Sequence, residues 1–256
     1  MPVKPAEDLA VRFPRVEGAA PDQDREWCEV LVDGEWRRIR FHDYGEIFSV
    51  PGLYEVVFHE HLECTSPRVV AQLLGSELGR AGVDPGSLRG LDVGAGNGMV
   101  AEELADLGVA SQVGVDLLQA AADAAERDRP GLYDDYLACD LTELDAAERR
   151  RLERSEPNLL ATVAALGFGD IPCDAFATAF DLIAEDGWIA FNIKADFLEE
   201  DDPSGFAGLV QGMLEDGVLE ERARVTYDHR LSIDGRALQY VAIVGVKRAD
   251  LAAASA

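Results

Sequence analysis

The sequence predicts an α/β fold built on a parallel β-sheet, and three observations predict it. Short apolar stretches alternate with stretches of helical periodicity between residues 64 and 248. Residues 91–98, Leu-Asp-Val-Gly-Ala-Gly-Asn-Gly, read as a strand end, a glycine turn and the start of a helix. Acids lie at the ends of three successive predicted strands, at Asp92, Asp116 and Asp140. Such alternation places helices on both faces of a sheet.

The predicted core elements follow one another with short connections. A helix begins at Ser66, which we assign as the N-cap because Pro67 suits the first helical position. In chain order we expect helix 66–80, strand 89–93, helix 98–107, strand 112–116, helix 118–128, strand 133–139, helix 144–155, a fully buried strand 159–166, helix 173–184, strand 187–193, helix 206–215, and a closing hairpin of strands 219–231 and 237–246.

The part of the chain before this core has three predicted segments, and a short one follows the core. Residues 1–25 hold four prolines and are expected to be irregular, and residues 26–63 combine a hairpin with a lid. The hairpin pairs 26–32 with 35–41 around Asp33-Gly34, which suits a type I′ turn. The tail, 249–256, is rich in alanine and expected to fray.

The glycine turn is the segment whose residue types are best explained by a bound ligand. Gly94, Gly96 and Gly98 expose backbone N–H groups at a helix N-terminus, where a side chain would obstruct a bound molecule. Their spacing, G-x-G-x-G, differs from the G-x-G-x-x-G of dinucleotide-binding folds. A buried Asp92 needs a donor or a cation beside it. Asp116 lies about 20 residues further on, where nucleotide-binding folds carry an acid that binds ribose.

These residues together resemble the first motif and strand-end acids of class I S-adenosylmethionine-dependent methyltransferases. The resemblance covers about residues 64–248 and implies that 92–98 hold the methionine part of the cofactor. It also implies that Asp116 binds the ribose hydroxyls and Asp140 the adenine amino group. The cofactor contacts that we expect are Asp92, Gly94, Ala95, Gly96, Gly98, Asp116, Leu117, Cys139, Asp140, Leu141, Gly167 and Tyr44.

The resemblance also implies a fold and an activity. The fold is a Rossmann-like seven-stranded sheet, mostly parallel with an antiparallel last strand, to which this chain adds the N-terminal hairpin and helical lid. The expected activity is methyl transfer from S-adenosylmethionine to a small molecule. Residues 167–172 lack the Asn/Asp-Pro-Pro-Tyr/Phe signature of base and amide methyltransferases, which opposes a DNA amino-methyltransferase. A non-catalytic binding or regulatory protein of this fold stays open. The glycine spacing and the closing hairpin oppose a nicotinamide-dependent oxidoreductase.

Two features of residues 42–63 and of the later strands bear on catalysis. Aromatic side chains Tyr44, Tyr54 and Phe58 are expected to cover the cofactor's methyl group, although an amphipathic helix burying Leu53, Val57 and Phe58 explains the segment equally well. Four histidines, His42, His59, His61 and His229, are candidates for a base, but the sequence favours a surface histidine over a base at each position. Asn192, Lys194 and Asp196 are expected to face the cleft. Lys194 could pair with a substrate carboxylate, although the sequence favours a strand-end lysine whose stem lies on apolar surface while its amine reaches water.

Composition restricts the partners and the compartment. The formal net charge of -26 opposes binding to nucleic acid and to anionic membranes. The four cysteines show neither metal-ligand nor disulfide spacing, so we expect reduced thiols and no metal. We find no signal-peptide core and no apolar run of about 20 residues, and we expect a cytoplasmic protein. A homodimer is left open.

Overall fold

The structure, a computed structural model, describes residues 9–14, 23–167, 170–199 and 202–251. Its main sheet has seven strands in the order β6-β5-β4-β7-β8-β10-β9. The five strands from β4 to β8 pair in parallel, and β10 pairs antiparallel with both β8 and β9. The strands are β4 (Arg89–Val93), β5 (Ser111–Asp116), β6 (Asp135–Ala138), β7 (Leu159–Thr162), β8 (Trp188–Lys194), β9 (Leu219–Leu231) and β10 (Ala237–Lys247). The predicted mixed sheet with an antiparallel ending is confirmed.

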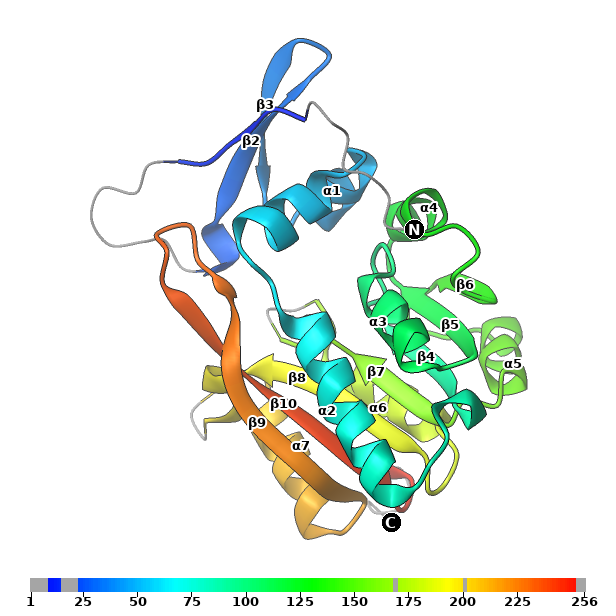
Figure 1. Cartoon of the computed structure of the whole chain (residues 1–256). Coiled ribbons are helices and arrows are strands. Elements are labelled where there is room, and N and C mark those ends of the chain that lie inside the picture. The colour runs from blue at the N-terminus through cyan, green and yellow to red at the C-terminus, as the bar shows by residue number, and fades with distance from the viewer. Residues whose placement is uncertain (1–8, 15–22, 168–169, 200–201, 252–256) are drawn as a thin grey trace.

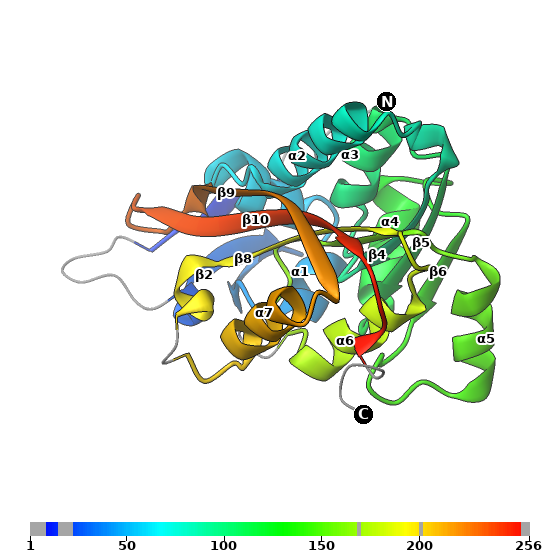
Figure 2. The ribbon, with the colours of Figure 1, turned by 90° about the horizontal axis from the view of Figure 1, so that it is seen from below.

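Helices cover both faces of this sheet (Figure 2). On one face Leu74 of α2 and Leu104 of α3 pack against the sheet, and on the other Phe176 of α6 and Val210 of α7 do so. Strands β7 and β8 are almost continuously buried, as expected of strands covered on two faces. The helices are α2 (Ser66–Ala81), α3 (Met99–Leu107), α4 (Gln119–Asp128), α5 (Ala146–Arg154), α6 (Cys173–Leu182) and α7 (Phe206–Glu215), with short 3₁₀ turns η3 (Pro85–Ser87) and η4 (Ala195–Leu198). Within the described part of the chain, no helix combines the length and apolar character needed to cross a membrane.

A second, three-stranded sheet precedes the core. It consists of β1 (Val11–Arg12), β2 (Trp27–Val32) and β3 (Glu35–Arg40), which pair antiparallel. The 3₁₀ turn η1 (Gln23–Arg25) directly precedes β2. Asp33 and Gly34 both have positive φ, 53° and 82°, as a type I′ turn requires. The predicted hairpin is confirmed. The short strand β1 falls in the segment that we expected to be irregular, because two residues are too few to give a periodic pattern.

Helix α1 (Tyr44–Ser49) and the π-helix η2 (Glu55–His61) form the segment that we call the lid, residues 42–63. Leu53 and Val57 are fully buried in a cluster that also contains Val30 and Ile39 of the small sheet. In Figure 1 the small sheet and α1 lie together at one end of the molecule, and α1 contacts α4. The small sheet therefore packs against the buried face of the lid.

Two local predictions were wrong, both because side chains make distant hydrogen bonds. Ser66 is the first helical residue and Thr65 is the N-cap, since the Ser66 hydroxyl lies 2.5 Å from His229 Nδ1 in a buried network. Strand β7 ends at Thr162, not at residue 166, because Ala164 has a φ of 57° that no strand can adopt. The Ala164 N–H donates to Asn192 Oδ1 at 2.6 Å, which holds this turn away from the strand direction.

Candidate functional site

The glycine turn lies at the centre of the sheet, directly after β4. This strand has β5 on one side and β7 on the other, so it marks the point where the strand order reverses and where open α/β sheets bind ligands. Gly94, Gly96 and Gly98 all have positive φ, between 53° and 89°. A Cβ on Gly96 would lie 3.1 Å from Cζ of Phe48 in the lid. Glycine is therefore required here both by backbone conformation and by the close approach of the lid.

Hydrogen bonds from neighbouring strands hold the turn in place. The N–H groups of Gly94 and Ala95 donate to the carbonyl oxygen of Val115 at 2.9 and 3.1 Å. The hydroxyl of Tyr136, on β6, donates to the carbonyl oxygen of Gly96 at 2.9 Å. The turn is thus fixed by β5 and β6 before any ligand binds.

Asp116 ends β5 and faces the turn. Its Oδ2 accepts a hydrogen bond from the Gly96 N–H at 3.0 Å, and its Oδ1 accepts one from the Leu118 N–H at 3.0 Å. Burial raises the pKa of this carboxyl, and the backbone N–H donors oppose that rise. Each carboxylate oxygen has a further lone pair, so Asp116 can also accept hydrogen bonds from ligand hydroxyl groups.

Asp92, in β4, is 1% exposed and lies beneath the turn. Its Oδ2 accepts a hydrogen bond from the Tyr133 hydroxyl at 2.7 Å, whereas its buried Oδ1 has no partner among the described residues. Burial raises the pKa of Asp92 to about 7, against the lowering effect of Tyr133. Tyr133 is the hydrogen-bond donor that we expected beside Asp92, and it pairs with only one of the two carboxylate oxygens.

The third strand-end acid, Asp140, is exposed to solvent. Its Oδ1 accepts hydrogen bonds from the backbone N–H and the hydroxyl of Thr142 at 2.8 and 2.7 Å, which lower the pKa of the carboxyl. Its neighbours Cys139 and Leu141 are buried, and burial raises the pKa of the Cys139 thiol to about 11. The loop of residues 139–141 therefore has two buried apolar side chains and one exposed carboxylate between them.

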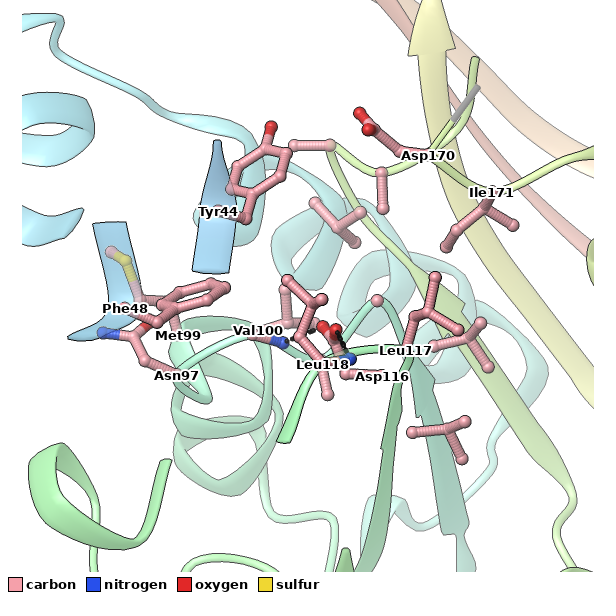
Figure 3. Close-up of a pocket in the computed structure, with 18 of the residues that line it drawn as sticks. Tyr44, Phe48, Asn97, Met99, Val100, Asp116, Leu117, Leu118, Asp170 and Ile171 are labelled. Atoms are coloured by element: carbon pink, nitrogen blue, oxygen red, sulfur yellow. Dashed lines mark hydrogen bonds between the residues drawn. The ribbon is translucent and has the colours of Figure 1, made fainter. Parts of the chain in front are cut away.

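A cavity of about 530 Å³ joins the glycine turn, the strand ends and the lid. Figure 3 shows Asp116 on one side of it, and Tyr44 and Asp170 on the opposite side. Its described lining residues include the aspartates 43, 116, 140 and 170, and none of them is lysine or arginine. A volume of this size is typical of sites for cofactors and small molecules.

Lid aromatics form the wall opposite the glycine turn. Tyr44, Phe48, Tyr54 and Phe58 all line the cavity, with stacked or tilted ring pairs at centroid distances of 4.8 to 6.3 Å. Leu53 and Val57 point instead into the small-sheet cluster. The predicted burial of Leu53 and Val57 is therefore confirmed, while the aromatic side chains on the other face of the lid line the cavity, where their contact with a cofactor stays a prediction.

Contacts between the lid and the core close the cavity on two sides. His42 Nδ1 lies 3.2 Å from Asp170 Oδ2, which joins the start of the lid to the loop after β7. On the other side the Arg127 guanidinium donates to the Phe48 carbonyl oxygen at 3.1 Å. Neither pair is close in sequence, so neither could be found from the pattern of residues.

A side chamber of about 30 Å³ extends the cavity beyond Asp170. It shares His42, Tyr44 and Asp170 with the main cavity, and adds Arg230 from β9 and Tyr240 from β10. The guanidinium of Arg230 donates to Glu26 Oε2 at 2.6 Å, and both side chains are buried.

Most of the predicted cofactor contacts come together in the cavity. Its lining includes Gly94, Ala95, Gly96, Asp116, Leu117, Cys139, Asp140, Leu141 and Tyr44. Three others, Asp92, Gly98 and Gly167, are described but lie behind this lining, and Gly167 packs against Phe197.

Some side chains that we expected near substrate lie elsewhere. Lys194 pairs with Asp196 at 2.6 Å and does not line the cavity, which agrees with the favoured strand-end lysine and not with a contact to a substrate carboxylate. Asn192 is fully buried, because it binds Ser66, Tyr227 and the Ala164 backbone.

The four histidines separate into three groups. His42 and His59 line the cavity, whereas His61 stacks on Phe13 with ring centroids 3.5 Å apart. His229 is buried beside Ser66, and burial lowers its pKa well below the usual value. Asp170, which the sequence did not single out, is the acid that faces His42.

The sequence matches no protein-family model and no curated protein. Solved structures do match. The N-methyltransferase NodS from Bradyrhizobium japonicum WM9, in complex with S-adenosyl-L-homocysteine, has a TM-score of 0.54 at 18% identity, over 81% of this chain and 97% of that one. Magnesium protoporphyrin IX methyltransferase (ChlM) from Synechocystis PCC 6803, with bound S-adenosylmethionine, has a TM-score of 0.51 at 12% identity, over 80% and 90%.

A candidate RNA methyltransferase from Pyrococcus horikoshii has a TM-score of 0.52 at 15% identity, covering 72% of this chain and 83% of that one. The chain therefore has the class I S-adenosylmethionine-dependent methyltransferase fold, as its sequence predicted. These three structures are an N-methyltransferase, a magnesium protoporphyrin IX methyltransferase and a candidate RNA methyltransferase, so the shared fold does not specify the methyl acceptor.

Proposed function

We propose that the protein transfers a methyl group from S-adenosylmethionine to a small-molecule acceptor. The observation that carries this proposal is the position of Asp116, whose carboxylate faces the cavity while backbone N–H groups of Gly96 and Leu118 hold both of its oxygens. A ribose placed against Asp116 would have the glycine turn on one side and the Cys139–Thr142 loop on the other. An adenosyl ligand with an amino-acid tail extends from its ribose in two directions, so it requires a binding surface on each of these two sides.

The residues present fit this cofactor. Gly96 leaves the space that a side chain would fill, and the cavity of about 530 Å³ is large enough for the ligand. Leu117 and Leu141 offer apolar surfaces for an adenine ring, with Asp140 at the edge as an acceptor for its amino group. When bound, S-adenosylmethionine supplies a methyl group on a positively charged sulfur.

The contribution of the protein to the reaction is mainly positioning. Holding the acceptor in line with the methyl group removes an entropic cost that can reach several kcal/mol. Tyr44 and Phe48 cover the glycine turn and exclude water from the place where the methyl would lie. Electron-rich ring faces also attract a positive sulfur centre.

A small acceptor is supported by the closure of the site. The lid is joined to the core at His42 and at Phe48, so the acceptor and the cofactor would share a cavity of about 530 Å³ that a side chamber extends by about 30 Å³. The net charge of -26 opposes an RNA or DNA acceptor, because phosphates would be repelled.

The test is binding followed by transfer. Calorimetry should detect binding of S-adenosylmethionine and S-adenosylhomocysteine, and no binding of NAD at the same concentrations. Methyl-labelled cofactor incubated with a metabolite extract should then label a compound of low molecular mass. Absence of cofactor binding would refute the proposal, and binding without any transfer would instead support a regulatory protein of this fold.

A further inference from the structure

The acceptor end of the cavity is formed by the residues that border both the main cavity and the side chamber. They are His42, Tyr44, Tyr54, Phe58, Cys64, Ala164 and Asp170. None of them belongs to the glycine turn or to the strand ends that would hold the cofactor. An acceptor that occupies the end of the main cavity next to the side chamber must therefore contact this set, whose charge and surface restrict its chemistry.

The charges at this end oppose an anionic acceptor. The described residues that line the main cavity include no lysine or arginine. Arg230 reaches the side chamber, but its guanidinium is bound to the Glu26 carboxylate at 2.6 Å and to the Leu231 carbonyl oxygen at 2.8 Å. A carboxylate or phosphate placed here would lie beside the Asp170 carboxylate, and no lysine or arginine among the described residues that line the main cavity would offset the repulsion between the two anions.

The same surface favours an organic cation. Rings of Tyr44, Tyr54 and Phe58 surround the space beside Asp170, and aromatic faces with a nearby carboxylate are the groups that bind ammonium ions. The His42 ring, 3.2 Å from Asp170, fixes the position of that carboxylate. A cofactor that carries a positive sulfur would repel a second cation, so an amine beside it needs such an acid.

We propose that the acceptor is an amine with an apolar substituent, bound as a cation by Asp170 and the three rings; this inference rests on the function proposed above. Before transfer the ammonium group loses one proton to the His42–Asp170 pair. The nitrogen lone pair then forms the new N–C bond, while the electron pair of the broken S–C bond stays on sulfur and neutralises it. The products are S-adenosylhomocysteine and the methylated amine as its ammonium ion, and the proton taken up by the His42–Asp170 pair passes to water.

Three probes of similar shape test the charge preference. Protein saturated with S-adenosylhomocysteine is titrated with 2-phenylethylamine, 2-phenylethanol or 3-phenylpropanoate by calorimetry. The amine should bind about tenfold more tightly than the alcohol, because only the ammonium group carries a positive charge that the Asp170 carboxylate and the aromatic ring faces attract. The acid should not bind at the same concentrations.

Variants separate a role of Asp170 from general damage to the fold. Asp170→Asn should remove most of the preference for the amine while the affinity for S-adenosylhomocysteine stays unchanged. Asp174→Asn is the matched control, because Asp174 is an exposed acid four residues away that does not line the cavity. It should keep the preference.

The outcomes distinguish the two proposals. The amine assignment alone is overturned if the protein binds S-adenosylhomocysteine but binds the alcohol or the acid with the same affinity as the amine. It is also overturned if the protein binds S-adenosylhomocysteine but none of the three probes. The same holds if Asp170→Asn keeps the full preference. A protein that does not bind S-adenosylhomocysteine overturns the proposed function itself.

Discussion

Arg129 lies between the lid and the core, and its guanidinium donates to Glu55 Oε1 of the π-helix at 2.8 Å. The same group donates to Glu102 of α3 at 2.8 Å and to the Asn97 carbonyl oxygen of the glycine turn at 3.2 Å. Only 12% of the Arg129 side chain and 18% of the Glu55 side chain are exposed. One cation therefore ties the lid to the turn that it covers.

Glu55→Gln should destabilise the protein and loosen the lid. Removing the charge leaves Arg129 mostly buried with one acid instead of two, and we expect a loss of about 1–2 kcal/mol in the free energy of unfolding. Urea denaturation measures this change. The Kd for S-adenosylhomocysteine should also rise, because a lid that opens more often holds the ligand less well.

Glu29→Gln is the control for this prediction. Glu29 pairs with Arg12 at 2.6 Å on the small sheet, where 54% of the arginine side chain is exposed. Surface pairs of this kind contribute about 0–1 kcal/mol, and this one is remote from the cavity lining. Equal losses in the two variants would contradict a special role for the lid contact.

Asp116→Asn should weaken binding of S-adenosylhomocysteine by about tenfold or more, because an amide can offer only one accepting oxygen where the carboxylate offers two. Calorimetry measures the change in Kd. Asp134→Asn is a suitable control, since Asp134 also accepts a backbone hydrogen bond, from Gln112 at 3.0 Å, but lies outside the cavity lining. An unchanged Kd in Asp116→Asn would remove Asp116 from the proposed ribose contact.

Local signals explain why the framework of this site could be predicted. The glycine turn needs positive φ at Gly94, Gly96 and Gly98, and few other residues adopt it, so residue type alone indicates the backbone shape. Parallel strands end at one edge of a sheet, which brings Asp116 and Asp140 to a single cavity. These inferences require only periodicity and connectivity.

The contacts that close the site could not be predicted, because they join residues far apart in sequence. His42 and Asp170 are 128 positions apart, and Arg129 and Glu55 are 74 positions apart. The run 159–166 was predicted to be one strand because all of its residues except Thr162 are apolar. It bends at Ala164, where a side chain from β8 accepts the backbone N–H that a strand would have used.

Tyr136→Phe should weaken cofactor binding without unfolding the protein. The substitution removes the hydroxyl that donates to the Gly96 carbonyl oxygen at 2.9 Å and leaves the ring in place. Loss of one such bond costs about 1 kcal/mol of stability. Because Gly96 also donates to Asp116, a looser turn should raise the Kd for S-adenosylhomocysteine several-fold. If the variant loses stability while calorimetry shows an unchanged Kd for S-adenosylhomocysteine, the hydrogen bonds from β5 alone hold the turn in place.

Asp92 should make stability fall as pH rises between about 4 and 7. Its pKa is about 7 in the folded protein because of burial, whereas an unfolded aspartate titrates near 4. In that window the unfolded chain has released a proton that the folded chain keeps, so each pH unit lowers the free energy of unfolding by up to about 1.4 kcal/mol. Above pH 7 both states are ionised and this contribution stays constant.

Asp92→Asn isolates this contribution, since an amide of nearly the same shape does not titrate. Urea denaturation of both proteins at pH 5, 6, 7 and 8 gives the difference in their free energies of unfolding, in which other titrating groups largely cancel. That difference should move in favour of the asparagine variant up to about pH 7 and then level off. A difference that is independent of pH would mean that Asp92 ionises normally, and that its unpaired Oδ1 has found a donor in solution.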